Sequence, residues 1–491
     1  MRRLILPEDM RACEARYFEA TGVKSIDAME RASEALADVV RETVPAGGQV
    51  IFACGSGGNG GDGIACARIL KDEYETQIVI PKPLRSADAL ENLRRAENAG
   101  VPIVNAVSEE PAAWVDALLG TGLSREPDGA YAAWIDRMNE SAAPVIAADI
   151  PSGLNGETGR AYGHCVRAAR TVAFGFGKPG LFLQDGLEAS GEVSIAPVGF
   201  PDAAFESPIR LMDAGDVARQ LPARRRNVYK NLCGHLLIVA GSFGMAGAAV
   251  MCARGAMRTG VGLVTIACPE SIVPILQTLV PGAMCVPLPE KDGAIAGTDA
   301  LRAAFVGKTA AVVGCGLSMR ANPDAVRAVL ESGLPAVIDA DALNLIAANG
   351  MQGLLRKYHV ITPHPGEARR LLRGTDGLDE LLQNPIAAAR RLSELGACAL
   401  FKGASCVISD GRETFVSASG CSGMARGGSG DILSGIMGAL IAEKSERTTA
   451  LNAALASEIH GLAGECAQWK YGSRGMVAGD IAEFLPEVLR G

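Results

Sequence analysis

The sequence predicts an α/β protein with two parallel-sheet domains, one after the other. Short apolar runs of strand length alternate with Ala-rich helical stretches, and this alternation occurs in two separate series. Strands that are buried on both faces are apolar throughout, so such runs indicate parallel sheets covered by helices on both sides. We expect strands at residues 49–53, 77–80, 145–148, 236–240, 263–267, 311–313 and 336–338.

The boundary between the two domains is expected near residue 215. The periodicity fails over residues 197–222, where prolines mix with polar residues, and residue 236 begins a new apolar run. We therefore predict domains at 1–215 and 219–491, within the range that 491 residues allow. The two halves are not repeats of each other. Each carries its own Gly-rich segments, so each is expected to have its own site.

The composition argues against nucleic-acid and membrane partners. The chain has 47 basic and 55 acidic residues, and its longest block of like charge is Arg224-Arg225-Arg226. No stretch approaches the roughly 18 apolar residues of a membrane span, and the first residues do not resemble a signal peptide. The thirteen cysteines are scattered through apolar segments without paired metal-ligand spacing. Such cysteines are typical of buried thiols in a reducing compartment, and we expect a cytoplasmic protein.

A glycine-rich segment follows the first expected strand. It reads Gly55-Ser56-Gly57-Gly58-Asn59-Gly60-Gly61-Asp62-Gly63 and leads into an apolar helix expected from Ile64. Glycines let backbone amides approach an anion, and a helix N-terminus adds partial positive charge, so we expect a phosphate-bearing ligand. The alternative is that the glycines only pack the helix against the strand. Asn59 and Asp62 favour a ligand, because a purely structural turn needs neither.

Polar side chains also stand where two further strands should end. Asp116 precedes Leu118-Leu119-Gly120-Thr121-Gly122, and Asp149-Ile150-Pro151 precedes Ser152. Open α/β sheets bind ligands at these strand ends. Oxygen atoms of Asn59, Asp116 and Ser152 could converge on a hard monovalent cation. Helix capping is the other interpretation of the same residues.

These motifs, with Phe176-Gly177-Lys178-Pro179-Gly180, occur in the order seen in the NAD(P)H-hydrate epimerase family, which residues 1–215 resemble. The resemblance implies a Rossmann-like parallel-sheet domain and a potassium ion held by Asn59, Asp116 and Ser152. It also implies a set of residues in contact with the hydrated cofactor. These are Gly58, Asn59, Gly60, Gly61, Asp62, Gly120, Thr121, Gly122, Leu123, Ser124, Arg125, Glu126, Tyr131 and Asp149. Gly58 stands where the family usually has a second asparagine.

The expected reaction constrains the catalytic groups of the N-terminal site. Inverting the carbon that carries the added hydroxyl needs proton transfer near a ring nitrogen and no redox partner, so a carboxylate and an amine in a shaped pocket suffice. Asp149 is the candidate acid/base and Lys178 its candidate partner. Either residue could instead position the substrate.

The strongest motif of the C-terminal half is Gly427-Gly428-Ser429-Gly430-Asp431, which precedes an apolar helix expected over 432–440. Glycine amides at a helix start can form an anion hole, and Asp431 can take a proton from a hydroxyl that faces the phosphate. The motif therefore predicts phosphoryl transfer, with a structural loop and a capping aspartate as the alternative. It lacks the Gly-x-x-x-x-Gly-Lys-Ser/Thr form of the usual nucleotide loop, which indicates a different kinase fold.

This motif resembles the anion hole of the ribokinase-like fold. With Thr362-Pro363-His364-Pro365-Gly366-Glu367 and the segment 339–344, it is similar to the NAD(P)H-hydrate dehydratase family over residues 219–491. The resemblance implies that Ala253, Gly316, His364 and Asp431 contact the S-hydrate. It implies that Lys402, Gly403, Ala404, Ser405, Cys406 and Gly430 hold the adenine nucleotide. The two prolines stiffen the loop around His364, although a loop histidine without function remains the alternative.

Together the halves resemble bifunctional hydrate repair enzymes. The resemblance implies that the N-terminal half interconverts the R and S hydrates of NADH and NADPH. The C-terminal half would dehydrate the S form with ADP and magnesium, giving NAD(P)H, AMP and phosphate. We also expect a homo-oligomer. Two alternatives remain: a kinase for a small alcohol, which the Gly-Ser-Gly-Asp loop alone would equally fit, and an N-terminal nucleotide-sensing module, against which Asp149 and Lys178 count.

Overall fold

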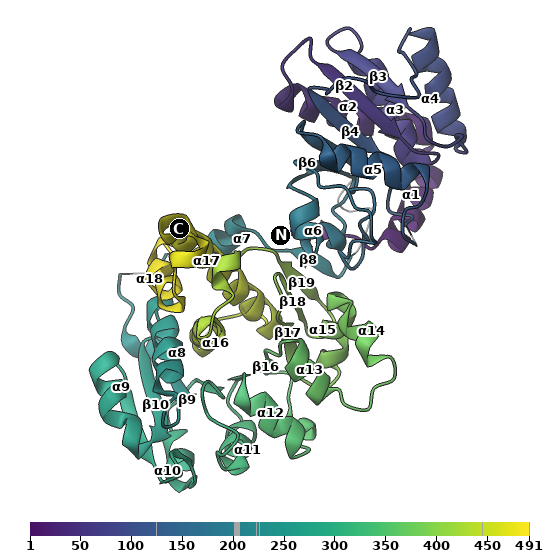
Figure 1. Ribbon diagram of the computed structural model, residues 1–491. Helices are drawn as coiled ribbons and strands as arrows, with labels where there is room; N and C mark the ends of the chain where they lie inside the picture. Colours follow the sequence, from purple (N-terminus) through teal and green to yellow (C-terminus); the bar gives the residue numbers. More distant parts are fainter. Residues whose placement is uncertain (124, 201–206, 222, 225, 444, 491) are drawn as a thin grey trace. The chain divides into compact units, whose positions relative to one another are not determined.

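The chain folds into two compact units. A computed structural model, shown in Figure 1, describes residues 1–123, 125–200, 207–221, 223–224, 226–443 and 445–490. One unit is Arg2–Ser207, and the other is Met1 with Pro208–Gly491. The division between Ser207 and Pro208 lies upstream of the boundary near residue 215 that the sequence predicted. The reason is that β8 (Ile209–Leu211) pairs in parallel with β19 (Thr414–Ser417) and so belongs to the C-terminal sheet.

The N-terminal unit is built on a six-stranded parallel sheet in the order β3-β2-β4-β5-β6-β7. Its strand order reverses between β2 and β4, the position at which open α/β sheets bind ligands. The strands of the unit are β1 (Arg2–Leu4), β2 (Gln49–Cys54), β3 (Glu75–Val79), β4 (Ala113–Ala117), β5 (Val145–Ala148), β6 (Arg170–Phe174) and β7 (Glu192–Ala196). Its α-helices are α1 (Pro7–Thr21), α2 (Ser25–Thr43), α3 (Gly58–Leu70), α4 (Ala87–Asn98), α5 (Ala130–Glu140) and α6 (Gly186–Ala189).

Both faces of the N-terminal sheet are buried, as the apolar runs predict. Along β2, Val50 and Phe52 lie in a core that includes residues of α2 and α3. The alternate residues Ile51 and Ala53 lie in a second core with Trp114. Side chains of a strand alternate between the faces, so an uninterrupted apolar strand requires cover on both sides. The expected Rossmann-like parallel-sheet domain is confirmed.

The C-terminal unit contains a larger mixed sheet in the order β8-β19-β18-β17-β16-β15-β14-β9-β10-β11. Its remaining strands in this sheet are β9 (His235–Val239), β10 (Leu263–Pro269), β11 (Met284–Leu288), β14 (Ala310–Val313), β15 (Ala336–Ile338), β16 (His359–Ile361), β17 (Cys398–Phe401) and β18 (Cys406–Ser409). The four strands expected in this unit, β9, β10, β14 and β15, pair in parallel, whereas β18, which the sequence did not indicate, pairs antiparallel with both β17 and β19. The connections between these three strands are too short for a crossover helix.

Helices cover the C-terminal sheet, and two of them pack unusually closely. A Cβ at Gly255 of α8 (Ala246–Thr259) would lie 2.5 Å from the Ile432 carbonyl oxygen of α16 (Ser429–Ala442). Glycine therefore sets the separation of these helices. The other α-helices of the unit are α7 (Ala214–Gln220), α9 (Val273–Leu279), α10 (Asp299–Ala304), α11 (Pro323–Glu331), α12 (Asp341–Ala348), α13 (Pro365–Leu371), α14 (Leu378–Leu382), α15 (Pro385–Ser393), α17 (Thr449–Gly475) and α18 (Ala478–Val488). A small hairpin pairs β12 (Glu290–Lys291) with β13 (Ala294–Ile295).

Several expectations from the sequence can be compared directly with this fold. Each of the seven expected strands overlaps an observed one. All thirteen cysteines are free thiols. Across the part of the chain that the structure describes, no helix has the length and apolar character needed to cross a membrane.

Candidate active sites

The N-terminal glycine segment is mostly helix rather than loop. α3 begins at Gly58, six residues before the predicted start at Ile64. Packing explains several of the glycines, because a Cβ at Gly60 would overlap the Gly55 carbonyl and one at Gly63 would lie 2.6 Å from Ala117 Cβ. Gly57 and Gly58 differ, since nothing lies within 4 Å of a Cβ added to either. Packing therefore accounts for Gly60 and Gly63 but not for Gly57 and Gly58, whose contact with a ligand stays a prediction.

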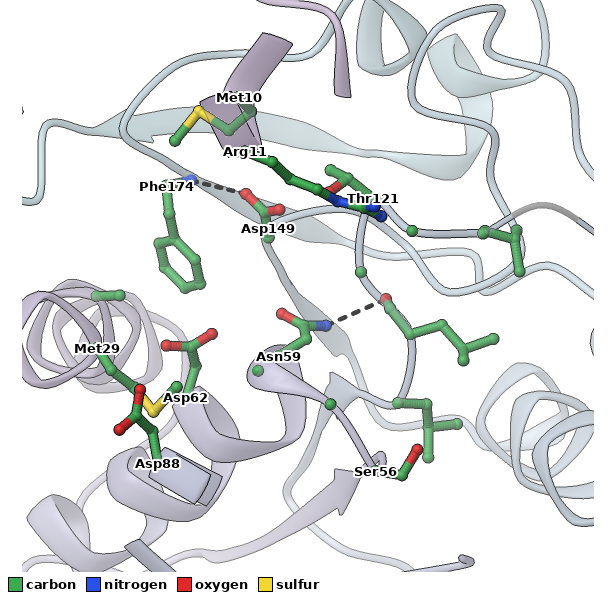
Figure 2. A pocket seen from close by; sticks show the side chains of 18 of the residues that line it. Met10, Arg11, Met29, Ser56, Asn59, Asp62, Asp88, Thr121, Asp149 and Phe174 are labelled. Carbon is green, nitrogen blue, oxygen red and sulfur yellow. Dashed lines mark hydrogen bonds between the residues drawn. The ribbon is translucent and has the colours of Figure 1, made fainter. Parts of the chain in front are cut away.

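A cavity of about 730 Å³ opens above these two glycines, at the C-terminal ends of β2 and β4. Figure 2 shows Asn59 between Asp149 on one side and Ser56 on the other. Twelve of the predicted N-terminal site residues line the cavity: Gly58, Asn59, Asp62, Gly120, Thr121, Gly122, Leu123, Arg125, Glu126, Tyr131, Asp149 and Lys178. Gly60 and Gly61 are instead buried in packing contacts. Ser124 lies outside the described residues.

The three residues expected to bind potassium are linked by hydrogen bonds, because Ser152 contacts Asp116 and both Asn59 and Ser152 contact the Leu119 carbonyl. The Ser152 hydroxyl donates to Asp116 Oδ1 at 2.6 Å, and the Ser152 amide donates to Asp116 Oδ2 at 2.7 Å. Asn59 Nδ2 donates to the Leu119 carbonyl at 3.1 Å. Asn59 Oδ1 is buried and, within the described part of the chain, accepts no hydrogen bond. An unused buried acceptor costs free energy unless a ligand contacts it.

Asp116 is fully buried, and burial raises its pKa to about 6 although hydrogen bonds from Ser152 and Leu118 lower it. Its hydrogen-bond partners are neutral groups. A buried carboxylate is stabilised most effectively by a positive charge. The orphaned amide oxygen and this carboxylate therefore fit a bound cation better than they fit helix capping.

The two catalytic candidates of the N-terminal unit form an ion pair. The Lys178 ammonium donates to Asp149 Oδ1 and, at 3.0 Å, to the Phe174 carbonyl. The Phe174 amide also donates to Asp149 Oδ1, at 3.0 Å. Lys178 is 1% exposed, whereas Asp149 is 15% exposed and faces the cavity. Asp149 holds a φ of +66°, a left-handed conformation that side-chain-bearing residues adopt rarely and that tends to occur at functional sites.

Two further acids lie near this pair. Burial raises the pKa of Glu14, with Lys178 lowering and Asp149 raising it. Burial also raises the pKa of Asp62 well above its usual value, and the negative charges of Asp149 and Glu14 add to that rise. Glu14 and its cavity neighbour Arg11 lie on α1, and sequence reasoning missed both because no motif marks that helix.

Two cations of the same cavity were also missed. Lys82 and Arg85 follow β3 and line the cavity. The Lys82 ammonium lies 4.4 Å from the centre of the Tyr131 ring, and the Tyr131 hydroxyl donates to Ser56 Oγ at 3.2 Å. The sequence did contain a signal for them, since the segment after β3 carries two cations and no acid before Asp88.

The Gly-rich motif of the predicted C-terminal site lies at the N-terminus of α16. α16 begins at Ser429 and carries Asp431 in its first turn. The first amides of a helix lack partners within the helix, and nothing lies within 4 Å of a Cβ added to Gly427, so the approach there is open. Burial raises the pKa of Asp431 to about 6, and the Asp339 carboxylate adds to the rise. A carboxylate with a raised pKa is a stronger base than an ordinary aspartate.

A charged network that sequence reasoning did not assign lies beside Asp431. The Lys402 ammonium donates to Asp339 Oδ1 at 2.7 Å, and the Ser434 hydroxyl donates to Asp339 Oδ2 at 2.7 Å. Burial opposes ionisation of Asp339, but Lys402 and Ser434 hold its pKa below the usual value. Glu367 lies 4.0 Å from the Lys402 ammonium, and burial raises its pKa. A Cβ at Gly430 would lie 3.8 Å from both Asp339 and Lys402, which brings Gly430 and Lys402 of the predicted nucleotide set together.

His364 is the N-cap of α13. Its Nδ1 accepts from the Gly366 amide at 3.0 Å, which leaves the proton of the neutral ring on Nε2. Nε2 lies 3.5 Å from Glu367 Oε1, and the side chain is 52% exposed. The structure therefore gives His364 a capping role and also presents Nε2 toward the charged network.

The remaining predicted residues of the C-terminal site differ in their surroundings. Gly316 has a φ of +59°, and a Cβ there would lie 2.7 Å from Ala248. Ala253 is fully buried in the hydrophobic core beside α16, so its methyl group faces other core residues. The segment from Gly403 to Ser405 joins β17 to β18, and Cys406 begins β18. The substrate and nucleotide contacts of these residues stay predictions.

Comparisons with known proteins agree on both halves. A family profile described as "YjeF-related protein N-terminus" matches residues 25–180, and one described as "NAD(P)H-hydrate dehydratase" matches residues 236–487. The chain is 36% identical to the bifunctional NAD(P)H-hydrate repair enzyme of Moorella thermoacetica, covering 90% of this chain and 87% of that protein. It is 34% identical to the Escherichia coli protein of the same name, covering 98% and 93%.

The solved structures support the fold of the C-terminal unit. A ribokinase-like superfamily protein from Enterococcus faecalis superimposes with a TM-score of 0.51 and 23% sequence identity. The match covers 58% of this chain and 97% of that protein. The expected ribokinase-like fold is confirmed.

Proposed function

The chain belongs to the family of bifunctional NAD(P)H-hydrate repair enzymes, and from this premise we propose that each of its units performs one step of hydrate repair. The N-terminal unit interconverts the R and S hydrates of NADH and NADPH, and the C-terminal unit dehydrates the S form with ADP. The observation that carries the proposal is that each unit holds a polar site at the C-terminal ends of its own parallel strands, with an accessible acid in each: Asp149 and Asp431.

Epimerisation uses the Asp149 and Lys178 pair. Both groups can exchange a proton, and only Asp149 is appreciably exposed to the cavity, so we assign it the proton transfer to substrate. Lys178 and the Phe174 amide hold one carboxylate oxygen in place, which leaves the other oxygen for the substrate. The open amides near Gly57 and Gly58 accept a phosphate group of the hydrate.

Potassium fits the N-terminal unit. Asn59 Oδ1, the Asp116 carboxylate and Ser152 Oγ would hold the ion, which supplies positive charge beside a site that binds a phosphorylated ligand. Asp116 lies one residue before the end of β4, Ser152 lies four residues after the end of β5, and Asn59 lies in the first turn of α3. Ion binding there would order the segment whose amides face the cavity.

Dehydration uses Asp431 and the amides before it. Asp431 takes the proton of the hydrate hydroxyl, the hydroxyl oxygen bonds to the β-phosphorus of ADP, and AMP leaves. The new phosphate then departs with the C–O bonding electrons, a proton is lost from the ring, and the double bond is restored. Lys402 and the Gly430 amide hold the nucleotide phosphates.

Magnesium enters this proposal with the nucleotide. Within the described residues there is no group of three or more His, Cys, Asp or Glu side chains placed to hold a metal ion. Magnesium binds proteins through few carboxylates and substrate phosphates, so the ADP phosphates would supply most of its ligands. Its contribution is to neutralise phosphate charge.

The cellular setting is inferred from the cysteines. Thirteen free thiols fit a reducing compartment, so we place the chain in the cytoplasm. Self-association into a homo-oligomer stays a prediction, which light scattering of the purified chain measures.

One assay tests the whole proposal. A mixture of R and S hydrates of NADH, incubated with the chain, ADP, magnesium and potassium, should be converted completely to NADH, followed by absorbance. Conversion of only the S fraction would contradict the epimerase activity. Phosphorylation of a small alcohol without hydrate turnover would show that the C-terminal unit is a kinase rather than a dehydratase.

A further inference from the structure

The N-terminal cavity has two chemically different regions. One contains Glu14, Asp62, Asp149 and Lys178, whose charges act on one another. The other is the basic region, which we define as Ser56, Lys82, Arg85 and Tyr131. In Figure 2, Ser56 lies on the far side of Asn59 from Asp149. A ligand whose reacting ring lies at Asp149 would therefore extend its remaining part toward the basic region.

The basic region is held together by direct contacts. The Ser56 amide donates to the Tyr131 hydroxyl at 3.1 Å, and the Arg85 amide donates to the Ser56 carbonyl at 2.8 Å. The Lys82 ammonium lies over the Tyr131 ring, and prolines on both sides of Lys82 restrict its backbone. Both cations are thus anchored next to the glycine segment.

Neither cation is committed to a strong partner within the described residues. Lys82 lies 3.3 Å from Asp128, but the two side chains are 38% and 66% exposed, and such solvent-exposed pairs contribute little. The nearest acid in the sequence, Asp88, accepts from Ser25 at 2.6 Å and lies beside Met29 in Figure 2. The basic region therefore has positive charge available for a ligand.

The position of these residues in the fold identifies the ligand group. In dinucleotide-binding sheets, the end of the strand next to the glycine-segment strand faces the adenosine ribose, where an acid binds the 2′-hydroxyl and a cation accommodates a 2′-phosphate. β3 is that neighbour of β2, and the segment after it carries Lys82 and Arg85. A phosphate monoester near pH 7 carries between about −1.5 and −2 charges. Two cations match that charge.

We propose that Lys82 and Arg85 bind the 2′-phosphate of NADPH hydrate, so that the epimerase site favours this substrate over NADH hydrate. The inference rests on the proposed epimerase function and names its preferred substrate. Its physical basis is that, without the 2′-phosphate, Lys82 keeps only its exposed contact with Asp128, and Arg85 has no ion pair within the described residues.

The test measures kcat/KM of the full-length chain for conversion of each R hydrate to its S form. The two forms are separated by chromatography, and ADP is left out so that no dehydration follows. The parent should favour NADPH hydrate by on the order of tenfold, a preference that falls as ionic strength rises. Lys82→Gln, Arg85→Gln and the double variant should reduce this ratio progressively toward one. Lys71→Gln removes a cation that pairs with Asp72 outside the cavity and should leave the ratio unchanged.

The ratio separates a 2′-phosphate contact from other roles, because a folding defect or a pyrophosphate contact would reduce kcat/KM equally for both hydrates. Equal losses, or a parent without preference, would overturn the inference while the epimerase function stands. A parent that epimerises neither hydrate would overturn the proposed function. In that case, calorimetric Kd values for both hydrates decide the inference: a double variant that weakens both equally, or neither, overturns it.

Discussion

Asp431 combines partial burial, a neighbouring carboxylate and a position in the first turn of a helix. We predict that Asp431→Asn lowers the dehydration rate by about two to four orders of magnitude, because the amide accepts no proton from the hydrate hydroxyl. Initial rates with S-hydrate and ADP measure this. Epimerisation of R-hydrate in the absence of ADP should be unchanged. Dehydration above a tenth of the parent rate would contradict the assignment.

The raised pKa of Asp431 has a definite sign in the pH profile. A base acts only when ionised, and the pKa of Asp431 in the free enzyme is about 6, so kcat/KM for dehydration should fall about tenfold per pH unit below that value. The rate should be level above it until another group titrates. Residual activity of Asp431→Asn should lack this acid limb. A parent profile that stays flat down to pH 5 would contradict the role of Asp431.

Asp116 allows a test of potassium. Burial raises its pKa to about 6, so protons and potassium should compete for the carboxylate, and the potassium concentration for half-maximal epimerisation should rise as pH falls through 6. Asp116→Ala should weaken R-hydrate binding in potassium, although it removes a negative charge near an anionic ligand. Titrations at matched ionic strength, with potassium or a bulky organic cation, measure this. Tighter binding of R-hydrate by Asp116→Ala in potassium buffer would contradict potassium binding at this site.

The sequence indicated chemical groups at motifs and missed groups that tertiary packing supplies. Asp149 and Lys178 stand in recognisable segments, and the structure pairs them. Glu14 reaches the same cavity from α1, more than 130 residues away in sequence, and no local pattern marks it. Asp339 lies in the segment 339–344 that carries the resemblance, but its charge interactions depend on the approach of Lys402 and Ser434 from other elements.

At the scale of elements, α3 illustrates how glycine spacing determines helix packing. Gly60→Ala should destabilise the chain by about 1–3 kcal/mol or more, because the added methyl overlaps the Gly55 carbonyl, which cannot move independently of β2. Gly58→Ala is the matched control. It adds the same methyl where nothing lies within 4 Å, so unfolding stability should change by less than about 0.5 kcal/mol. Denaturant midpoints measure both, and equal midpoints would contradict the packing role.

The strands were predictable and the start of this helix was not. Apolar residues on both faces of β2 identify a buried strand without further information. Glycine is a poor helix former, so a run of glycines reads as a loop, and only the closeness of α3 to β2 and β4 explains why helix forms there. The antiparallel pairing of β18 was missed for a related reason. Strand direction depends on the length of the connection rather than on the apolar pattern.

At the scale of the whole molecule, each unit has its own core and its own site. We predict that fragments 1–207 and 208–491 each fold and keep one activity. A fragment that begins at residue 219 should be less stable than 208–491, because it lacks β8, which pairs with β19, and most of α7. Thermal unfolding and the two separate assays measure this. Loss of structure in both 1–207 and 208–491 would show that the units depend on each other.

The left-handed backbone of Asp149 has a consequence for laboratory evolution. A residue with a Cβ is strained there, whereas glycine adopts this conformation at little cost. That relief is outweighed, because Asp149→Gly would leave the Lys178 ammonium, which is 1% exposed, without its carboxylate partner. A library scored only for heat resistance should therefore keep the strained aspartate at this position, since the carboxylate that faces the cavity is also the partner of a buried lysine.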